Sequence, residues 1–229
     1  MDHRDKECKQ SKNIMKKIGI GCAVVGALVI AGVILLIVAG GSYNRLVRLG
    51  QSVDQQWAQV QNVYQRRADL VPNLVNTVSG AANFEKSTLT EITAARASVG
   101  QVKMDGAGAP TDPAKLAEFE RAQGQLASAL SRLLVVVERY PELKANANFV
   151  NLQAQLEGTE NRISVERGRF NETVQAFNTA IKSFPAVLYA GLFGFKPRPY
   201  FTATPGSDRP PTVQFDFSKP STPPKPEKP

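Results

Sequence analysis

A long uncharged run near the N-terminus constrains this chain more than any other part of its sequence. Residues 18–41 contain no charged side chain, and as an α-helix they would extend about 36 Å at about 1.5 Å per residue. The hydrocarbon core of a bilayer is about 30 Å thick, whereas the apolar core of a secretory signal peptide holds only about 7–15 residues. The sequence therefore predicts a retained anchor, a single transmembrane helix over residues 18–41.

The cations on either side of this run predict its orientation. The leader, residues 1–17, carries six Lys and Arg side chains, whereas residues 42–61 carry only Arg45 and Arg48. Cytoplasmic flanks of membrane helices are enriched in cations. We therefore expect a single-pass membrane protein with a basic cytoplasmic leader and with everything after residue 41 exported.

Four stretches of the exported part have apolar residues at steps of three and four, the spacing of one face of a helix. These stretches cover residues 46–78, 84–102, 116–140 and 149–184. Amphipathic helices joined by short connections bury their apolar faces by packing together. We expect an all-α fold in which residues 42–186 form an antiparallel up-and-down bundle of about four helices. The periodicity leaves open whether the long first and fourth helices pair as a coiled coil, within one chain or between two.

Prolines and glycines predict where these helices end. Pro72 lies inside the first helix and should either kink it or break it in two. Asp112 and Pro113 close a glycine-rich and proline-rich loop, as the N-cap and first residue of the third helix. Tyr140 and Phe184 each precede a proline and are predicted to end the third and fourth helices.

The character of the chain changes after the predicted bundle. Residues 187–202 are apolar, aromatic and rich in glycine, and they should either cap the open end of the bundle or contact lipid. Rings and long cations are favoured at a membrane interface. The candidate membrane contacts are Tyr189, Phe193, Phe195, Lys196 and Arg198. In residues 203–229, eight of the 27 residues are proline, which predicts a disordered tail.

Residue types needed for most catalytic and metal sites are missing from the exported part. The single histidine, His3, lies in the leader, and both cysteines, Cys8 and Cys22, precede residue 42. This excludes histidine bases, thiol nucleophiles and histidine or thiolate metal ligands there. The chain carries a formal charge of +8, but residues 42–202 mix 18 cations with 14 acids, unlike a nucleic-acid footprint. We predict no enzymatic activity, cofactor, metal, nucleic acid or small-molecule substrate.

Polar side chains within the helices are the remaining candidates for a site. Arg67 falls on the apolar face of the first helix, seven residues after Val60, and four polar residues crowd the fourth helix. These four are Glu157, Glu160, Asn161 and Arg162. They are candidates for a partner site, but the pattern favours a structural cluster in which paired ions fix the register of the helices.

Several long strings carry a family resemblance. They are WAQVQNVYQRRADLVPNLV at residues 57–75, YPELKAN at 140–146 and LEGTENRI at 156–163, followed by the pairs Phe170-Asn171, Phe177-Asn178 and Phe184-Pro185. Over roughly residues 43–201 the chain resembles the LemA family. The resemblance implies a bacterial protein with one N-terminal anchor and a helical bundle, with no established enzymatic function or cofactor. It supplies no role for the proline-rich tail.

Two functions fit these observations. The first is a non-enzymatic structural or adaptor protein of the bacterial envelope. It would be held in the inner membrane, with its bundle in the periplasm or outside the cell, and would bind a protein partner or itself. The alternative is a module that contacts or remodels the membrane surface through residues 187–201.

Overall fold

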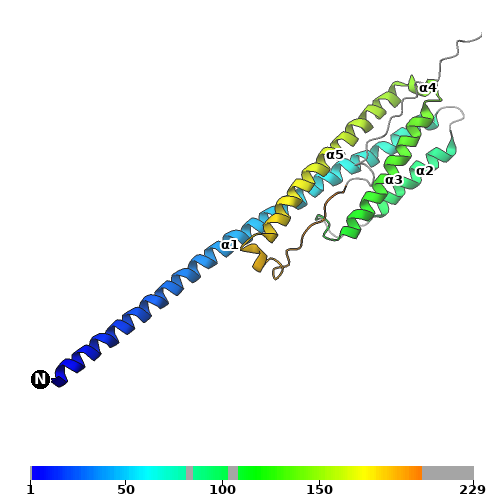
Figure 1. Cartoon of the computed structure of the whole chain (residues 1–229). Helices are drawn as coiled ribbons and strands as arrows, with labels where there is room; N and C mark the ends of the chain where they lie inside the picture. Colours follow the sequence, from blue (N-terminus) through cyan, green and yellow to red (C-terminus); the bar gives the residue numbers. More distant parts are fainter. Residues whose placement is uncertain (1, 81–84, 103–107, 203–229) are drawn as a thin grey trace, which may run out of the picture.

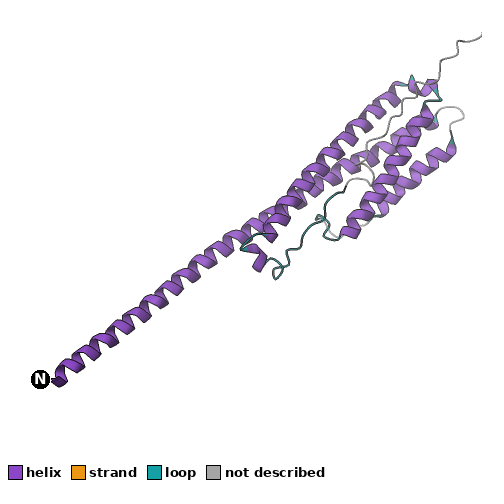
Figure 2. Cartoon of the chain, viewed as in Figure 1, coloured by secondary structure: helices purple, strands orange, loops and turns teal. Residues whose placement is uncertain are grey.

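The structure is a computed structural model that describes residues 2–80, 85–102 and 108–202, with side chains from residue 26 onward except residues 27 and 35. The described residues form helices and loops without a strand, which confirms the all-α class (Figure 2). The elements are α1 Asp2–Ser79, α2 Lys86–Gln101, α3 Pro113–Val137, α4 Pro141–Lys144, α5 Ala147–Lys182 and the short 3-10 helix η1 Ala186–Leu188. The proline-rich tail lies outside the described residues.

Helix α1 joins the predicted anchor to the rest of the molecule without a break. It passes through Gly40 and Gly41 and continues beyond Pro72 to Ser79, so the alternative of two helices separated at Pro72 is wrong. A proline leaves the carbonyl four residues earlier without its helical donor. Here that carbonyl belongs to Ala68, and Arg96 of α2 donates its Nε–H to it at 3.1 Å. The neighbouring helix thus satisfies the group that Pro72 leaves free.

Side chains at the helix ends explain where the other helices begin. Asp112 accepts a hydrogen bond from the amide of Ala114, and Pro113 follows it as the first residue of α3, which confirms the predicted cap. Asn146 accepts from the amides of Asn148 and Phe149 at the start of α5.

The third and fourth helices each end a few residues before the proline that was predicted to stop them. α3 stops at Val137, and Tyr140, which precedes Pro141 and the separate short helix α4, has a non-helical backbone with φ −122° and ψ 84°. Phe184 lies beyond α5, which ends at Lys182, and its side chain is exposed rather than buried.

The four long helices lie side by side, and successive ones run in opposite directions (Figure 1). Helix α5 packs along α1, and α2 packs on α3. The contacts between α1 and α5 run antiparallel, from Gly50 against Phe177 to Arg67 against Glu160. The predicted apolar face of the third helix is confirmed, because its side chains from Leu116 to Val137 are buried.

Two hydrophobic cores follow one another along the helices. The first lies nearer the exposed part of α1 and is built around Trp57, which packs against Phe119, Phe170 and Phe201 at ring-centroid distances of 5.4, 5.5 and 6.0 Å. The second lies at the far end, where α1, α2, α3 and α5 meet around Leu74, Ile92, Leu126 and Leu133. A polar layer separates these cores.

Candidate functional sites

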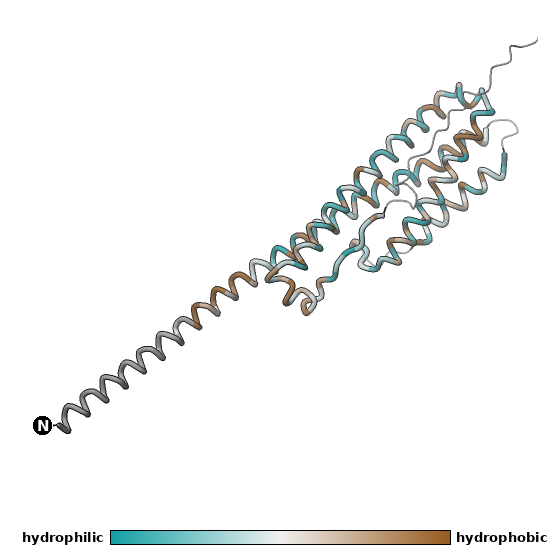
Figure 3. The backbone as a smooth tube through the Cα atoms, in the orientation of Figure 1, coloured by the Kyte–Doolittle hydropathy of each residue, from teal (hydrophilic) through white to brown (hydrophobic). Residues whose placement is uncertain are grey.

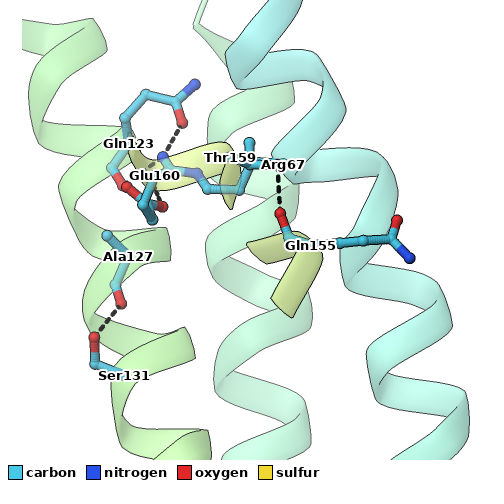
Figure 4. A network of polar contacts seen from close by, with 7 residues as sticks. All are labelled: Arg67, Gln123, Ala127, Ser131, Gln155, Thr159 and Glu160. Atoms are coloured by element: carbon cyan, nitrogen blue, oxygen red, sulfur yellow. Dashed lines mark hydrogen bonds and ion pairs between the residues drawn. The ribbon is translucent and has the colours of Figure 1, made fainter. Parts of the chain in front are cut away.

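Arg67 is the centre of the polar layer. It lies on α1 with only 2% of its surface exposed, and its Nη1 donates to Glu160 Oε1 of α5 at 2.6 Å. Its Nη2 donates to Gln123 of α3, reaching the backbone oxygen at 3.0 Å and the side-chain oxygen at 2.5 Å. Figure 4 shows the guanidinium between these two helices. One arginine therefore joins three helices at one level.

The position of this layer matches the boundary between the two cores. Gln123 lies between Phe119 of the first core and Leu126 of the second, and the buried Thr159 lies between Leu156 and Ile163 in the same way. Thr159 donates its hydroxyl to the carbonyl of Gln155 at 2.7 Å (Figure 4). Because buried polar groups require matched partners, a helix shifted by one turn would lose these bonds. The layer thus favours a single register.

The structure brings only part of the predicted polar cluster into contact. Glu160 binds Arg67, but Glu157 is exposed and accepts from Gln153 of its own helix at 3.0 Å. Asn161 and Arg162 are exposed on α5 as well. Gln123 is not among the predicted site residues. A glutamine on the buried face of α3 is the signal in the sequence that could have identified it.

A groove of about 430 Å³ lies beside the polar layer. Within it, Arg167 of α5 pairs with Glu120 of α3 at 2.7 Å and donates to the carbonyl of Thr202 at 3.0 Å. Burial raises the pKa of Glu120 above its ordinary value, and Arg167 and the backbone of Thr202 oppose that rise. Burial likewise raises the pKa of Tyr64. The charges that line this groove are largely paired with one another.

Two asparagines of α5 fix the segment that follows η1. Asn178 exchanges two hydrogen bonds with the backbone of Arg198, and Asn171 does the same with Phe201. Arg198 also donates to the carbonyl of Ala109 and lies 3.6 Å from Asp54. Phe201 is buried in the first core. Residues 198–201 therefore lie along the packed helices, and Arg198, a candidate membrane contact, is engaged within the protein.

The start of the same segment is arranged differently. Ala186 and Ala190 are buried in the first core, and Gly194, with a φ of 78°, turns the chain so that the amide of Phe195 donates to the carbonyl of Ala190. Large apolar side chains within this stretch and just before it are uncovered. We call this set the apolar foot: Phe184, Val187, Leu188, Leu192 and Phe193.

The apolar foot lies beside α1 at the place where this helix leaves the packed helices (Figure 1). The Tyr189 hydroxyl donates to the carbonyl of Ala39 at 3.4 Å. The ring of Tyr43 meets those of Phe193 and Phe195 edge-on, at 5.4 and 5.6 Å. Phe195 is half-buried against the first core, whereas Lys196 is exposed. Of the five candidate membrane contacts, Phe193 and Lys196 are thus exposed at this end of the molecule, and Tyr189 and Phe195 are half-buried there.

From Leu28 to the start of the packed helices, the described side chains of α1 are mostly exposed and apolar (Figure 3). In the stretch that begins at Leu28, the most apolar 18 consecutive residues have a mean hydropathy of 1.7, and none of them is buried. By length and composition it can cross a membrane. Within the part of the chain that the structure describes, no group of three His, Cys, Asp or Glu side chains is placed to hold a metal ion.

These features define a class: an all-helical protein whose first helix runs from an exposed apolar stretch into a packed helical body. A family model described as the LemA family matches residues 56–215. The chain belongs to the LemA family, which confirms the resemblance seen in its sequence.

Individual relatives are distant. The chain is 26% identical to the magnetosome protein MamQ of Magnetospirillum gryphiswaldense and 25% identical to MamQ 1 of Paramagnetospirillum magneticum, in each case over 73% of this chain and 67% of the relative. It is 25% identical to Protein LemA of Metamycoplasma hominis, over 63% of this chain and 61% of that protein.

Proposed function

We propose that this protein is a non-enzymatic structural or adaptor protein of the bacterial cell membrane, with one transmembrane helix and an exported antiparallel bundle. One observation supports this most directly: α1 is a single helix that carries an uncovered apolar stretch straight into the hydrophobic cores. Such a helix couples an anchor rigidly to the body, because no flexible linker separates them. The body is then held at a fixed distance from the anchor.

The polar groups of the body support a structural role. Arg67 binds Glu160 and Gln123 across helices, and Arg167 pairs with Glu120 in the same way, so these charges are neutralised locally. In this proposal the outer surface of the helices is what a protein partner or a second copy of the chain recognises. The relatives named as magnetosome proteins are compatible with a role at a membrane-bound structure.

Two measurements test the proposal on the full-length chain. A reporter that is active only outside the cytoplasm, fused after Phe201, should be active, whereas activity of a cytoplasm-only reporter at that site would reverse the topology. A photo-crosslinking residue at Val135, which is 70% exposed on α3, should give one discrete adduct in cells. A size of two chains would identify self-association, a different size would identify a partner, and no adduct from any exposed position of the body would contradict an adaptor.

A further inference from the structure

The apolar foot is an uncovered apolar surface at the end of the body next to the anchor. Leu192, Phe184 and Leu188 are 86%, 78% and 75% exposed. Residues 183–195 contain no charged side chain, yet they are held firmly, through buried Ala186 and Ala190 and through the rings of Tyr43 and Phe195. A contiguous apolar patch on an ordered segment marks an interaction surface.

The position of the foot is tied to the end of the apolar stretch of α1. Tyr189 reaches the carbonyl of Ala39, two residues before the end of the uncharged run at Gly41. If residues 18–41 fill the hydrocarbon core, Tyr189 and Phe193 lie at its boundary. Aromatic side chains are favoured at that depth, since one end of the ring system is apolar and the other is hydrated.

The two stretches of chain that carry the foot and the ring of Tyr43 are free of acids. Residues 18–53 and 173–202 contain no Asp or Glu, and their exposed cations include Arg45, Arg48, Lys182 and Lys196. Asp54, the first acid after the uncharged run on α1, lies 3.6 Å from Arg198. Arg45 and Arg48 lie about 6 and about 10 Å beyond Gly41 along the helix. The headgroup layer is about 5–8 Å thick on each side, so Arg45 lies within it and the long side chain of Arg48 can reach it. Phosphate groups of anionic lipids are the complementary partner there.

We propose that the apolar foot inserts into the exported leaflet of the bilayer that α1 crosses, and that the surrounding cations bind anionic lipid headgroups. This proposal rests on the proposed membrane anchor and adds a second membrane contact to it. Two contacts fix the tilt of the body relative to the membrane, because a helix alone is free to tilt and rotate. A second copy of the chain is a poorer occupant, since two feet placed face to face would bring eight exposed cations together.

The test uses the full-length chain with Cys8→Ala and Cys22→Ala. A single cysteine, labelled with an environment-sensitive fluorophore, is placed by Leu192→Cys on the foot, Ile30→Cys on the anchor or Val135→Cys on the distant surface of α3. Each protein is reconstituted at one chain per nanodisc, in phosphatidylcholine with or without phosphatidylglycerol, and with or without brominated acyl chains. We expect brominated lipid to quench the label at 192 several-fold more than the label at 135, and most in discs that contain phosphatidylglycerol.

The label at Ile30 separates the two proposals. Quenching at 30 without quenching at 192 overturns the foot as a lipid contact and leaves the anchor standing, whereas no quenching at 30 overturns the anchor and the foot with it. If the label at 192 is unquenched in single-chain discs but becomes shielded from a water-soluble quencher when two chains share a disc, the foot binds a second copy and the lipid proposal is wrong.

A charge variant tests the headgroup contact separately. Lys182→Gln with Lys196→Gln should reduce the extra quenching that phosphatidylglycerol causes at 192. The matched control, Lys86→Gln with Lys144→Gln, removes two exposed cations from the distant end and should leave it unchanged. An undiminished lipid preference in the first variant would overturn the role of these cations, and circular dichroism of all variants verifies that they are folded.

Discussion

Asn171 and Asn178 lie seven residues apart on α5, and each binds both backbone groups of one residue in the segment that runs back along the helix. Asn178 contacts Arg198 at 2.9 and 2.8 Å, and Asn171 contacts Phe201 at 3.0 and 2.9 Å. Seven residues of α-helix extend about 10.5 Å and three extended residues about 10 Å. The two spacings match, so both asparagines can bind the segment at once.

Replacing Asn178 by Ala should therefore loosen residues 196–202. The amide and carbonyl of Arg198 lose their partners, and an unsatisfied buried polar group costs about 1–3 kcal/mol. Denaturant unfolding in detergent should show a loss in that range, and proteolysis should begin within this segment. Asn151→Ala, at an exposed position of the same helix, is the control. Equal protease resistance of the two variants would show that the asparagine is not what holds the segment.

Phe170 and Phe177 provide a test of the first core. Both are buried, and Phe170 contacts Trp57 and Phe201 directly. Truncating a buried phenylalanine to alanine removes apolar contacts and leaves a cavity, at a cost of about 3–5 kcal/mol. Thermal melts should show this loss for each variant but hardly any for Val165→Ala, which is exposed on the same helix. A Phe170→Ala variant with the same Tm as the parent protein would contradict the assignment of Phe170 to this core.

The fold was largely predictable from local patterns, because helical periodicity and caps depend on residues close in sequence. The apolar positions from Leu116 to Val137, the cap at Asp112 and the burial of Arg67 were all predicted. The continuity of α1 through Pro72 was not, since the carbonyl that Pro72 leaves free is that of Ala68, and its donor is Arg96, 28 residues after Ala68.

The partners of the polar residues could not be predicted from the sequence either. Glu157 and Glu160 lie three residues apart in the same cluster, and periodicity did not distinguish them. Only the position of α3 decides that Glu160 meets Arg67 and that Gln123 completes the layer. In the same way, the sequence placed Phe193 and Arg198 in one candidate membrane contact, whereas packing separates them because the two asparagines bind the backbone near Arg198.

Substituting Arg67 and substituting Glu160 should lower the free energy of unfolding by different amounts. Glu160→Ala leaves the buried guanidinium without its counter-ion, which in a fully buried pair costs about 3–5 kcal/mol. Because the Glu160 side chain is 47% exposed, water reaches this site and we expect a loss of about 2 kcal/mol. Arg67→Met removes the charge and keeps the volume, so it should cost less. Chemical denaturation compares both with Glu157→Ala, which should be neutral; a larger loss for Arg67→Met would reverse the assignment.

Glu120 predicts a dependence of stability on pH. Burial raises the pKa of this carboxyl above the ordinary value of 4.5, so the folded protein holds the proton more tightly than the unfolded chain does. The associated stabilisation is complete below pH 4.5 and is lost as the pH rises through the folded pKa.

Glu120→Gln mimics the protonated form at every pH. The Tm of the variant should therefore be close to that of the parent at pH 4 and rise relative to it by pH 7, measured in detergent by circular dichroism. Glu118→Gln, at an exposed position two residues earlier on α3, serves as the control and should show a smaller change. If the Tm of Glu120→Gln instead fell relative to the parent between pH 4 and pH 7, then Arg167 would outweigh burial and the ionised carboxylate would be the form that stabilises the fold.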